Sequence, residues 1–419
     1  MADLTAPGLR QPLNESVYDR QNATRCFIPV RIPPRVAGIV HAQFDALNSR
    51  AAELRAAGHR VIALGQAIPG FPPPPVAIRA AQEALASGTA HVYSADAGRP
   101  SLRLALCARL RETHDVAATP DEVIITAGGN QAFMLAMMTT VDPRDEVLLP
   151  GPYFVNHEMT VRAIGAVPVE VPLSEARGFA LRWADLEPHV SSQTRAVVVC
   201  TPSNPTGAVV ERDEMMRIVR ELAARRVVVL ADETYARFVY GGEFWSVASL
   251  PEWRENVILT STFSKSFGMT GWRVGYLLAD KRVTEQAIKI QDAMVICAPV
   301  VSQIAVEAAI RHAWDYPLSF HEELIARRQV LVDGLRSIPR LHWTPTGGAF
   351  FAFVRVNGCA DSERLSRDIL EREHVVTIPG ASFGQGGEGF IRLSYGASGQ
   401  DELREALGRL GRYFDMMIE

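Results

Sequence analysis

Lysine is scarce in this chain of 419 residues. Only Lys265, Lys281 and Lys289 are present, although Lys and Arg together number 43, so arginine supplies almost all of the positive charge. Codon bias is a sufficient explanation of this composition, but the composition has a useful consequence. Any chemistry that requires a lysine amine is restricted to three candidate residues.

Other features are absent as well. No apolar run approaches the roughly 18 residues that a transmembrane helix needs. The N-terminal stretch MADLTAPGLRQPLNESVYDR contains no hydrophobic signal region. The net charge of −4 argues against a role on nucleic acids or membrane surfaces. The cysteines lack the spacing of a metal site and indicate reduced thiols in a cytoplasmic protein without a metal: Cys26, Cys107, Cys200, Cys297 and Cys359.

The length is too great for one ordinary core and predicts a large domain with a smaller one. From about residue 121, short and nearly pure apolar runs alternate with helical segments. Such runs are typical of a parallel sheet that is buried on both faces in an α/β fold. We predict that residues 61–315 form the large domain. Residues 1–60, which begin with an N-terminal arm, and residues 316–419 are expected to form a smaller α+β domain.

Several apolar runs end in residues that suit a ligand, and open α/β sheets bind ligands at the carboxyl ends of their strands. Gly128 and Gly129 open a helix after EVIIT, where free amides and the helix dipole favour an anion such as phosphate. A tight turn explains these two glycines equally well on their own. Asn204 lies next to prolines after AVVVC and could aim its amide at a ligand, or only form a turn.

Two further strand ends carry charged residues. Asp232 is the first charge after VVVL, where a carboxylate is costly without a cation or donors, although it could instead cap a helix. Tyr235 follows three residues later. After VILTS, the stretch TFSKSFGMTGWRVGY places Lys265 among hydroxyl side chains, and Arg273 eight residues on offers a fork that suits a phosphate.

These residues together fit one ligand, pyridoxal phosphate. Its phosphate would be bound by the turn at 128–131 and by three side chains, Thr262, Ser264 and Arg273. Its ring cation would face Asp232, and its aldehyde would condense with Lys265. The other two lysines have structural explanations, because Lys281 follows Asp280 at a predicted helix start and Lys289 lies on a predicted solvated helix face.

Seven motifs, in family order, resemble the fold-type I pyridoxal-phosphate enzymes of the class I/II aminotransferase family. They are YSADAGRPSLR (93–103), TAGGNQAF, PYFVNH (152–157), NPTG (204–207), DETY (232–235), SKSFGMTGWRVGY and FIRLSYG. The similar region runs from about residue 61 to residue 396. The resemblance implies an aspartate aminotransferase-like fold, in which a mostly parallel sheet flanked by helices forms the large domain beside a small α+β domain.

The resemblance also implies roles for residues near the cofactor ring. Lys265 matches the Schiff-base lysine, which also transfers protons, and Asp232 matches the partner of the pyridine nitrogen. His157 resembles the group behind that aspartate, although a hydrogen-bonded surface histidine is the alternative. Phe154 occupies the position of the ring that stacks on the cofactor. Tyr235, together with Asn204, matches the residues that hydrogen-bond the 3′ oxygen.

Other roles concern the phosphate and the substrate. Gly129 and Asn130 belong to the expected phosphate turn. Tyr93 resembles the tyrosine that reaches the phosphate of the neighbouring subunit's cofactor, which implies a homodimer. Arg392 matches the arginine that binds the substrate α-carboxylate. Ala67 departs from the family pattern, because a glycine is usual in that loop, and its methyl group is expected to narrow the substrate site.

The predicted function is transfer of an amino group from an L-amino acid to a 2-oxo acid. The segment VICAPVVSQ lacks the arginine with which the aspartate-specific branch binds a side-chain carboxylate. A neutral, aromatic or sulfur-containing donor is therefore expected in preference to a dicarboxylic one.

Other reactions use the same motifs. Lyases, cyclising synthases and oxidases of specialised metabolism share the imine, the aspartate and the arginine, so the motifs leave them open. A pyridoxal-phosphate-binding transcription regulator is a third reading. The region before the first strand is too short and insufficiently basic for its helix-turn-helix domain.

Overall fold

The computed structural model describes residues 30–40 and 44–416. Its largest sheet has seven strands, and all neighbours pair in parallel except β8, which is antiparallel to both β2 and β7. In spatial order the strands are β2 (Val123–Thr126), β8 (Gly275–Leu278), β7 (Val257–Thr262), β6 (Val228–Asp232), β5 (Thr194–Cys200), β3 (Glu146–Gly151) and β4 (Val167–Pro172). The predicted mostly parallel sheet is therefore confirmed.

Helices cover both faces of this sheet because alternate strand residues are apolar on both sides. In β5, Val197 and Val199 pack into one core cluster, whereas Ala196 and Val198 pack into another. The helices of the first cluster are α3 (Pro75–Ala86), α4 (Pro100–His114), α8 (Arg212–Ala224) and α11 (Val300–His312). Those of the second are α5 (Gly129–Thr140), α6 (Val155–Ala163) and α10 (Lys281–Val295).

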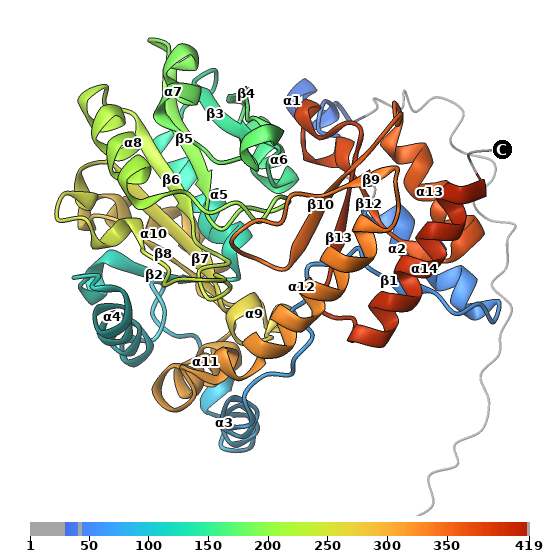
Figure 1. Ribbon diagram of the computed structural model, residues 1–419. Helices are drawn as coiled ribbons and strands as arrows, with labels where there is room; N and C mark the ends of the chain where they lie inside the picture. Colours follow the sequence, from blue (N-terminus) through green and yellow to red (C-terminus); the bar gives the residue numbers. More distant parts are fainter. Residues whose placement is uncertain (1–29, 41–43, 417–419) are drawn as a thin grey trace, which may run out of the picture.

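A second, antiparallel sheet lies beside the first (Figure 1). Its strands, in order, are β12 (Ile378–Pro379), β13 (Phe390–Ser394), β10 (Phe351–Val356) and β9 (Leu341–His342). The helices around it are α2 (Phe44–Ala56), α12 (His321–Arg336), α13 (Ser362–Glu373) and α14 (Gln400–Met416). Figure 1 shows α2, in blue, beside the orange α13, so these two helices, far apart in the sequence, pack together.

The short strand β1 (Ile62–Ala63) pairs in parallel with β11 (Val375–Val376). This pairing connects the chain just after residue 61, the predicted domain boundary, to the C-terminal part. The domain boundaries themselves stay predictions. The N-terminal arm of residues 1–29 and Cys26 lie outside the described residues.

Five of the strands correspond to the apolar runs of the sequence, namely β2, β3, β5, β6 and β7. Two strands of the large sheet were not predicted. β4 is an edge strand whose residues are mostly half-exposed or exposed, so it lacks an apolar run. β8 begins at Gly275 within the SKSFGMTGWRVGY motif. At the predicted domain boundary near residue 316, a 3-10 turn over Tyr316–Phe320 precedes α12, which begins at His321.

Within residues 30–40 and 44–416, none of the helices combines the length and the apolar character that crossing a membrane requires. The four cysteines of this part of the chain are free thiols: Cys107, Cys200, Cys297 and Cys359.

Candidate active site

A cavity of about 810 Å³ lies at the carboxyl ends of the central strands. Strand register brings three segments to this edge, because Cys200 of β5 is level with Asp232 of β6, which is level with Thr260 of β7. All the predicted site residues except Tyr93 line the cavity: Ala67, Gly129, Asn130, Phe154, His157, Asn204, Asp232, Tyr235, Thr262, Ser264, Lys265, Arg273 and Arg392. Its volume suits a cofactor together with a small substrate.

Asp232 is the last residue of β6 and is fixed by two donors. Its Oδ2 lies 3.1 Å from Nε2 of His157, and its Oδ1 accepts a hydrogen bond of 3.0 Å from the backbone N–H of Thr234. Burial alone would raise the pKa of Asp232, but these hydrogen bonds outweigh it and hold the pKa below its ordinary value. The ring of His157 is buried and packs against Phe133 and Phe154. Asp232 is therefore a preorganised anion that can accept a charged donor.

Lys265 lies in the short helix α9 (Phe263–Ser266), directly after β7. Its Nζ donates a hydrogen bond of 2.6 Å to the carbonyl of Ala67. Burial, followed by the positive charges of Arg392 and Arg273, lowers the pKa of Lys265 to about 8. A substantial fraction of this amine is therefore neutral near physiological pH and able to attack a carbonyl carbon.

The other two lysines lie on the surface. Lys281 forms an ion pair of 3.2 Å with Asp121, and Lys289 donates to the side chain of Gln286. Both side chains are exposed and neither lines the cavity. Of the three lysines only Lys265 lines the cavity, where its pKa is lowered.

One end of the cavity suits an anion. Gly129 begins α5, and the hydroxyls of Thr262 and Ser264 are hydrogen-bonded to each other at 2.8 Å beside it. Arg273 Nη1 donates to Ser264 Oγ at 3.3 Å. A Cβ atom added to Gly128 would lie 2.3 Å from Arg273 Nη2, so the close approach of this arginine requires glycine there. Helix amides, hydroxyls and a guanidinium converge in this anion-binding end.

Arg392, in β13, also lines the cavity. Its Nη1 donates to Asn204 Oδ1 at 2.7 Å and its Nη2 to the carbonyl of Gly65 at 2.5 Å, while its buried Nε has no protein partner. The rings of Phe44, Phe351 and Phe383 surround the guanidinium at 5.6, 4.7 and 5.0 Å. Burial lowers the pKa of Arg392 to about 10.

No carboxylate of the described residues forms an ion pair with Arg392. A buried guanidinium without an anion is expensive, and a ligand carboxylate would supply the missing charge. Arg392 is therefore an open site for an anionic group, in addition to the anion-binding residues around Arg273.

Tyr235 is buried and its ring packs edge-on against Phe350 and Phe351. Burial raises the pKa of its hydroxyl above the ordinary value, so the group stays protonated. Ala67 lines the cavity and also contacts the core cluster around Phe350. Its carbonyl, which accepts from Lys265, is as much a part of the site as its methyl group.

Tyr93 is the one predicted residue that the structure places elsewhere. Its side chain is 75% exposed, in the loop that follows a 3-10 turn over Thr89–His91. This position is outside the cavity of its own chain. The expected role of Tyr93 in a neighbouring subunit stays a prediction.

Sequence reasoning missed several apolar residues of the cavity, including Ile39, Phe44, Met134 and Met159. They carry no polar or catalytic group that could single them out. Met134 lies one turn after Asn130 on α5, but this spacing alone does not distinguish a cavity wall from a core.

The family described as aminotransferase class I and II matches residues 59–410. The chain belongs to this family. A probable aspartate/prephenate aminotransferase of Aquifex aeolicus is 34% identical over 384 residues, covering 90% of this chain and 96% of its own. Aromatic-amino-acid aminotransferase 2 of Thermococcus litoralis is 35% identical over 355 residues, or 84% of this chain and 90% of its own.

A solved structure is also similar. The aspartate aminotransferase of Thermus thermophilus with maleate has a TM-score of 0.86 at 31% identity, covering 91% of this chain and 99% of its own. The expected aspartate aminotransferase-like fold is thus confirmed, and so is the expected enzyme class. Class I and II aminotransferases are pyridoxal-phosphate-dependent enzymes.

Proposed function

We propose that this aminotransferase binds pyridoxal phosphate on Lys265 and transfers the amino group of a neutral L-amino acid to a 2-oxo acid. The observation that carries the proposal is that one cavity combines a reactive lysine with two separate sites for anionic groups and a carboxylate. A half-buried lysine of lowered pKa lines the same cavity as the anion-binding residues around Arg273, the open guanidinium of Arg392 and the half-buried anion Asp232. No other lysine of the described residues lines a cavity of this kind.

The donor set fits each part of the cofactor. Gly129, Thr262, Ser264 and Arg273 would bind the phosphate, and Asn130 belongs to the same turn. Phe154 would cover the ring. Bound through its aldehyde to a lysine, pyridoxal phosphate supplies an electron sink for the bond electrons at the substrate Cα.

The side chains of this chain would then hold and move the protons. Asp232, held by His157, would keep a proton on the ring nitrogen because its own pKa is low. Tyr235 and Asn204 would hydrogen-bond the ring oxygen. The free amine of Lys265 would take the proton from the substrate Cα, and Arg392 would orient the substrate through its α-carboxylate.

Attachment can be tested by borohydride reduction of the purified protein, followed by peptide mapping. The reduced cofactor is expected on Lys265 alone. A reduced adduct on Lys281 or Lys289, with Lys265 unmodified, would contradict the assignment.

The reaction can be tested by mixing the enzyme with an amino acid and no acceptor. An aminotransferase should form one 2-oxo acid per active site and then stop until a second 2-oxo acid is added. Continued release of ammonia over many turnovers would instead identify a lyase or an oxidase.

The preference for a neutral donor is supported by the lining of the cavity. Among the described residues that line it, Lys265, Arg273 and Arg392 are the only lysines and arginines, and each has a proposed role. None remains for a second substrate carboxylate. The lining residues that have no proposed role are mostly apolar and form an apolar wall, which includes Ile39 and Met134.

A lysine side chain introduced on that apolar wall should change the specificity for the amino-acid donor. We expect kcat/KM for phenylalanine or methionine to exceed that for aspartate at least tenfold. Met134→Lys should raise the relative activity on aspartate. Met138→Lys is the matched control, because Met138 lies one turn further along α5 and is 45% exposed. A wild-type preference for aspartate would refute the proposed substrate class.

We further propose a homodimer in the cytoplasm in which Tyr93 completes the phosphate site of the partner. Gln303 Nε2 donates to Ser94 Oγ at 3.0 Å and thereby fixes the loop next to Tyr93 against α11. Nearby apolar side chains are exposed, among them Val92 and Val295, at 69% and 41%. Such side chains favour burial by a second copy.

Mixing two inactive variants tests this assembly. Tyr93→Ala and Lys265→Ala should partly restore activity in a hybrid dimer, because one of its two sites would then be intact. A fully active monomer in sedimentation would contradict the proposal.

A further inference from the structure

Glu233 is a buried carboxylate that the proposed reaction does not use. It follows Asp232 directly, is 4% exposed and does not line the active-site cavity. Among the described residues no lysine, arginine or histidine forms an ion pair with it. Burial raises its pKa to about 7. A carboxyl group at this position is unfavourable for folding, so its geometry needs an explanation.

The side chain of Glu233 is fixed to a different segment of the chain. Its Oε1 accepts a hydrogen bond of 2.9 Å from the backbone N–H of Val247, and its Oε2 accepts one of 2.8 Å from Ser246 Oγ. Ser246 caps a short 3-10 helix over Val247–Ser249. Ser246, Val247 and Ala248 are themselves almost fully buried, so Glu233 is bonded to a rigid part of the core.

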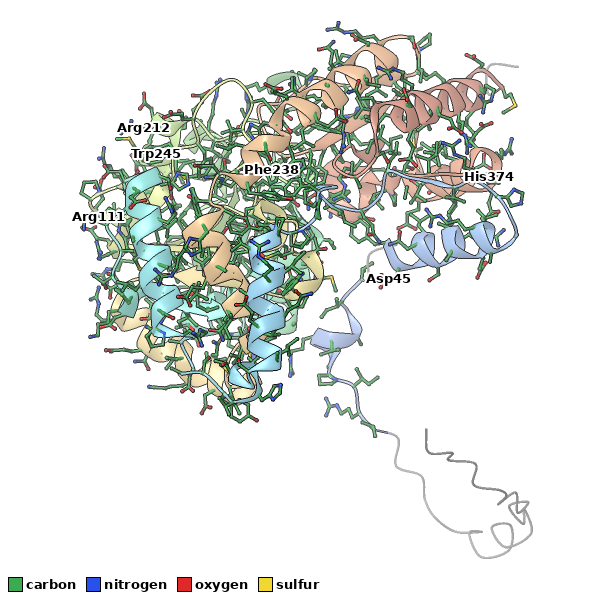
Figure 2. All side chains as sticks on the ribbon, turned by 90° about the horizontal axis from the view of Figure 1, so that it is seen from below. Asp45, Arg111, Arg212, Phe238, Trp245 and His374 are labelled. Atoms are coloured by element: carbon green, nitrogen blue, oxygen red, sulfur yellow. The ribbon has the colours of Figure 1, made fainter. Side chains whose placement is uncertain are left out.

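The segment that contains Ser246 and Val247 is also fixed by a contact nearer the surface. Trp245 packs against the guanidinium of Arg212 at 5.3 Å, and Figure 2 shows the two side chains close together near the surface. Residues 245–249 are thus attached to α8 on one side and to Glu233 on the other.

The backbone of Glu233 connects this segment to the active site. Its N–H donates to the carbonyl of Thr260 at 3.0 Å, which extends the β6–β7 ladder by one residue. Its carbonyl accepts from Ser261 Oγ at 3.3 Å. Successive residues of an extended chain point to opposite sides. Asp232 consequently lines the cavity while Glu233 faces the core, and Tyr235 lines the cavity after the turn.

We propose that Glu233 is a positioning residue that holds the 232–235 turn, and with it Asp232 and Tyr235, against the cofactor. The inference rests on the proposed binding of pyridoxal phosphate. Glu233 acts through the geometry of its hydrogen bonds and not through its charge. A carboxylate and a carboxamide can both accept a hydrogen bond from the backbone N–H of Val247, and a carboxamide can also donate one to Ser246 Oγ. The substitution Glu233→Gln should therefore preserve this positioning role, and Glu233→Ala should abolish it.

The test uses three variants of the full chain: Glu233→Ala, Glu233→Gln and Glu122→Ala. Glu122 is the matched control, since it is 5% exposed and hydrogen-bonded to Arg254 and Thr119, and does not line the cavity. The readouts are the Kd of the apoprotein for pyridoxal phosphate, the pH titration of the bound cofactor's absorbance, and amide hydrogen exchange of residues 232–235 without cofactor.

Glu233→Ala should weaken cofactor binding at least tenfold, shift the absorbance titration and speed exchange in the turn. Glu233→Gln should restore all three to near wild-type values, and Glu122→Ala should lower thermal stability without changing them. Unaltered cofactor binding in Glu233→Ala, failure of glutamine to restore it, or an equal loss in Glu122→Ala would each overturn the inference. If the wild-type chain itself does not bind pyridoxal phosphate, the proposed function fails, and faster exchange in the turn of the Glu233→Ala apoprotein still tests the positioning role.

Discussion

Replacing Arg392 with methionine should affect the free energy of unfolding very little but the binding of an amino-acid substrate strongly. The guanidinium is buried among three aromatic rings without a carboxylate partner in the described part of the chain. A fall in its pKa from 12.5 to about 10 corresponds to a cost of about 3 kcal/mol for keeping the charge there. Methionine removes that cost, but it also removes the hydrogen bonds to Asn204 and Gly65, worth about 1 kcal/mol each.

The two effects nearly cancel, so the unfolding free energy of Arg392→Met should stay within about 2 kcal/mol of the wild type. Activity should respond very differently. Two charge-assisted hydrogen bonds to a substrate carboxylate are worth about 4 kcal/mol, which is about a thousandfold in kcat/KM. An amine substrate that has no carboxylate should be almost insensitive to the substitution.

Urea unfolding of the apoproteins and steady-state kinetics would measure both quantities. Arg254→Met is the control, because it leaves the buried carboxylate of Glu122 unpaired and should cost about 3 kcal/mol or more. If Arg392→Met destabilises the chain as much as Arg254→Met does, the guanidinium supports the fold and the reasoning is wrong. Normal kcat/KM on amino acids would refute the binding role.

Three further outcomes follow from the titrating groups of the site. Asp232→Ala should keep the fold but lose several orders of magnitude in Cα deprotonation, measured by exchange of the substrate α-hydrogen, and near-normal exchange would show that the ring nitrogen is controlled elsewhere. Because the pKa of Lys265 is lowered to about 8, the rate of reconstitution with pyridoxal phosphate should rise with pH around 8, and a rise centred near 10.5 would contradict this. The pKa of Glu233 is raised from 4.5 to about 7, so the native state holds its proton more tightly and unfolding free energy falls as pH rises through that window, by up to about 3 kcal/mol. Glu233→Gln should therefore gain stability relative to wild type between pH 5 and pH 8 in urea titrations, and a constant difference would show that this carboxyl does not titrate there.

The sequence predicted those parts of the site in which a polar group interrupts an apolar pattern. Asp232, Asn204 and Lys265 each follow a buried run, and strand ends of a parallel sheet meet at one edge, so their convergence could be expected. The residues Met134 and Met159 could not be found in this way. A methionine on an apolar helix face has the same pattern whether it faces a core or a cavity.

The long-range contacts of Arg392 were also beyond prediction from spacing. Its hydrogen bonds to Asn204 and Gly65 depend on how β13 lies against the large sheet, which no local pattern specifies. Glu233 was overlooked for a related reason. It stands within the DETY motif, but its partners at Ser246 and Val247 are 13 and 14 residues away in a segment without any motif.

The residues that line the cavity extend from Ile39 to Arg392, so all of this stretch of the chain must be present before the cavity can form. The contact between Gly65 and Arg392 joins segments that are 327 residues apart in the chain and therefore leave the ribosome at very different times. An emerging chain could fold its seven-stranded sheet, whose last strand ends at Leu278, and still lack the substrate end of the site. Cofactor capture with full affinity should therefore follow the synthesis of β13, and chains truncated before β13 should accumulate as folded but cofactor-poor species.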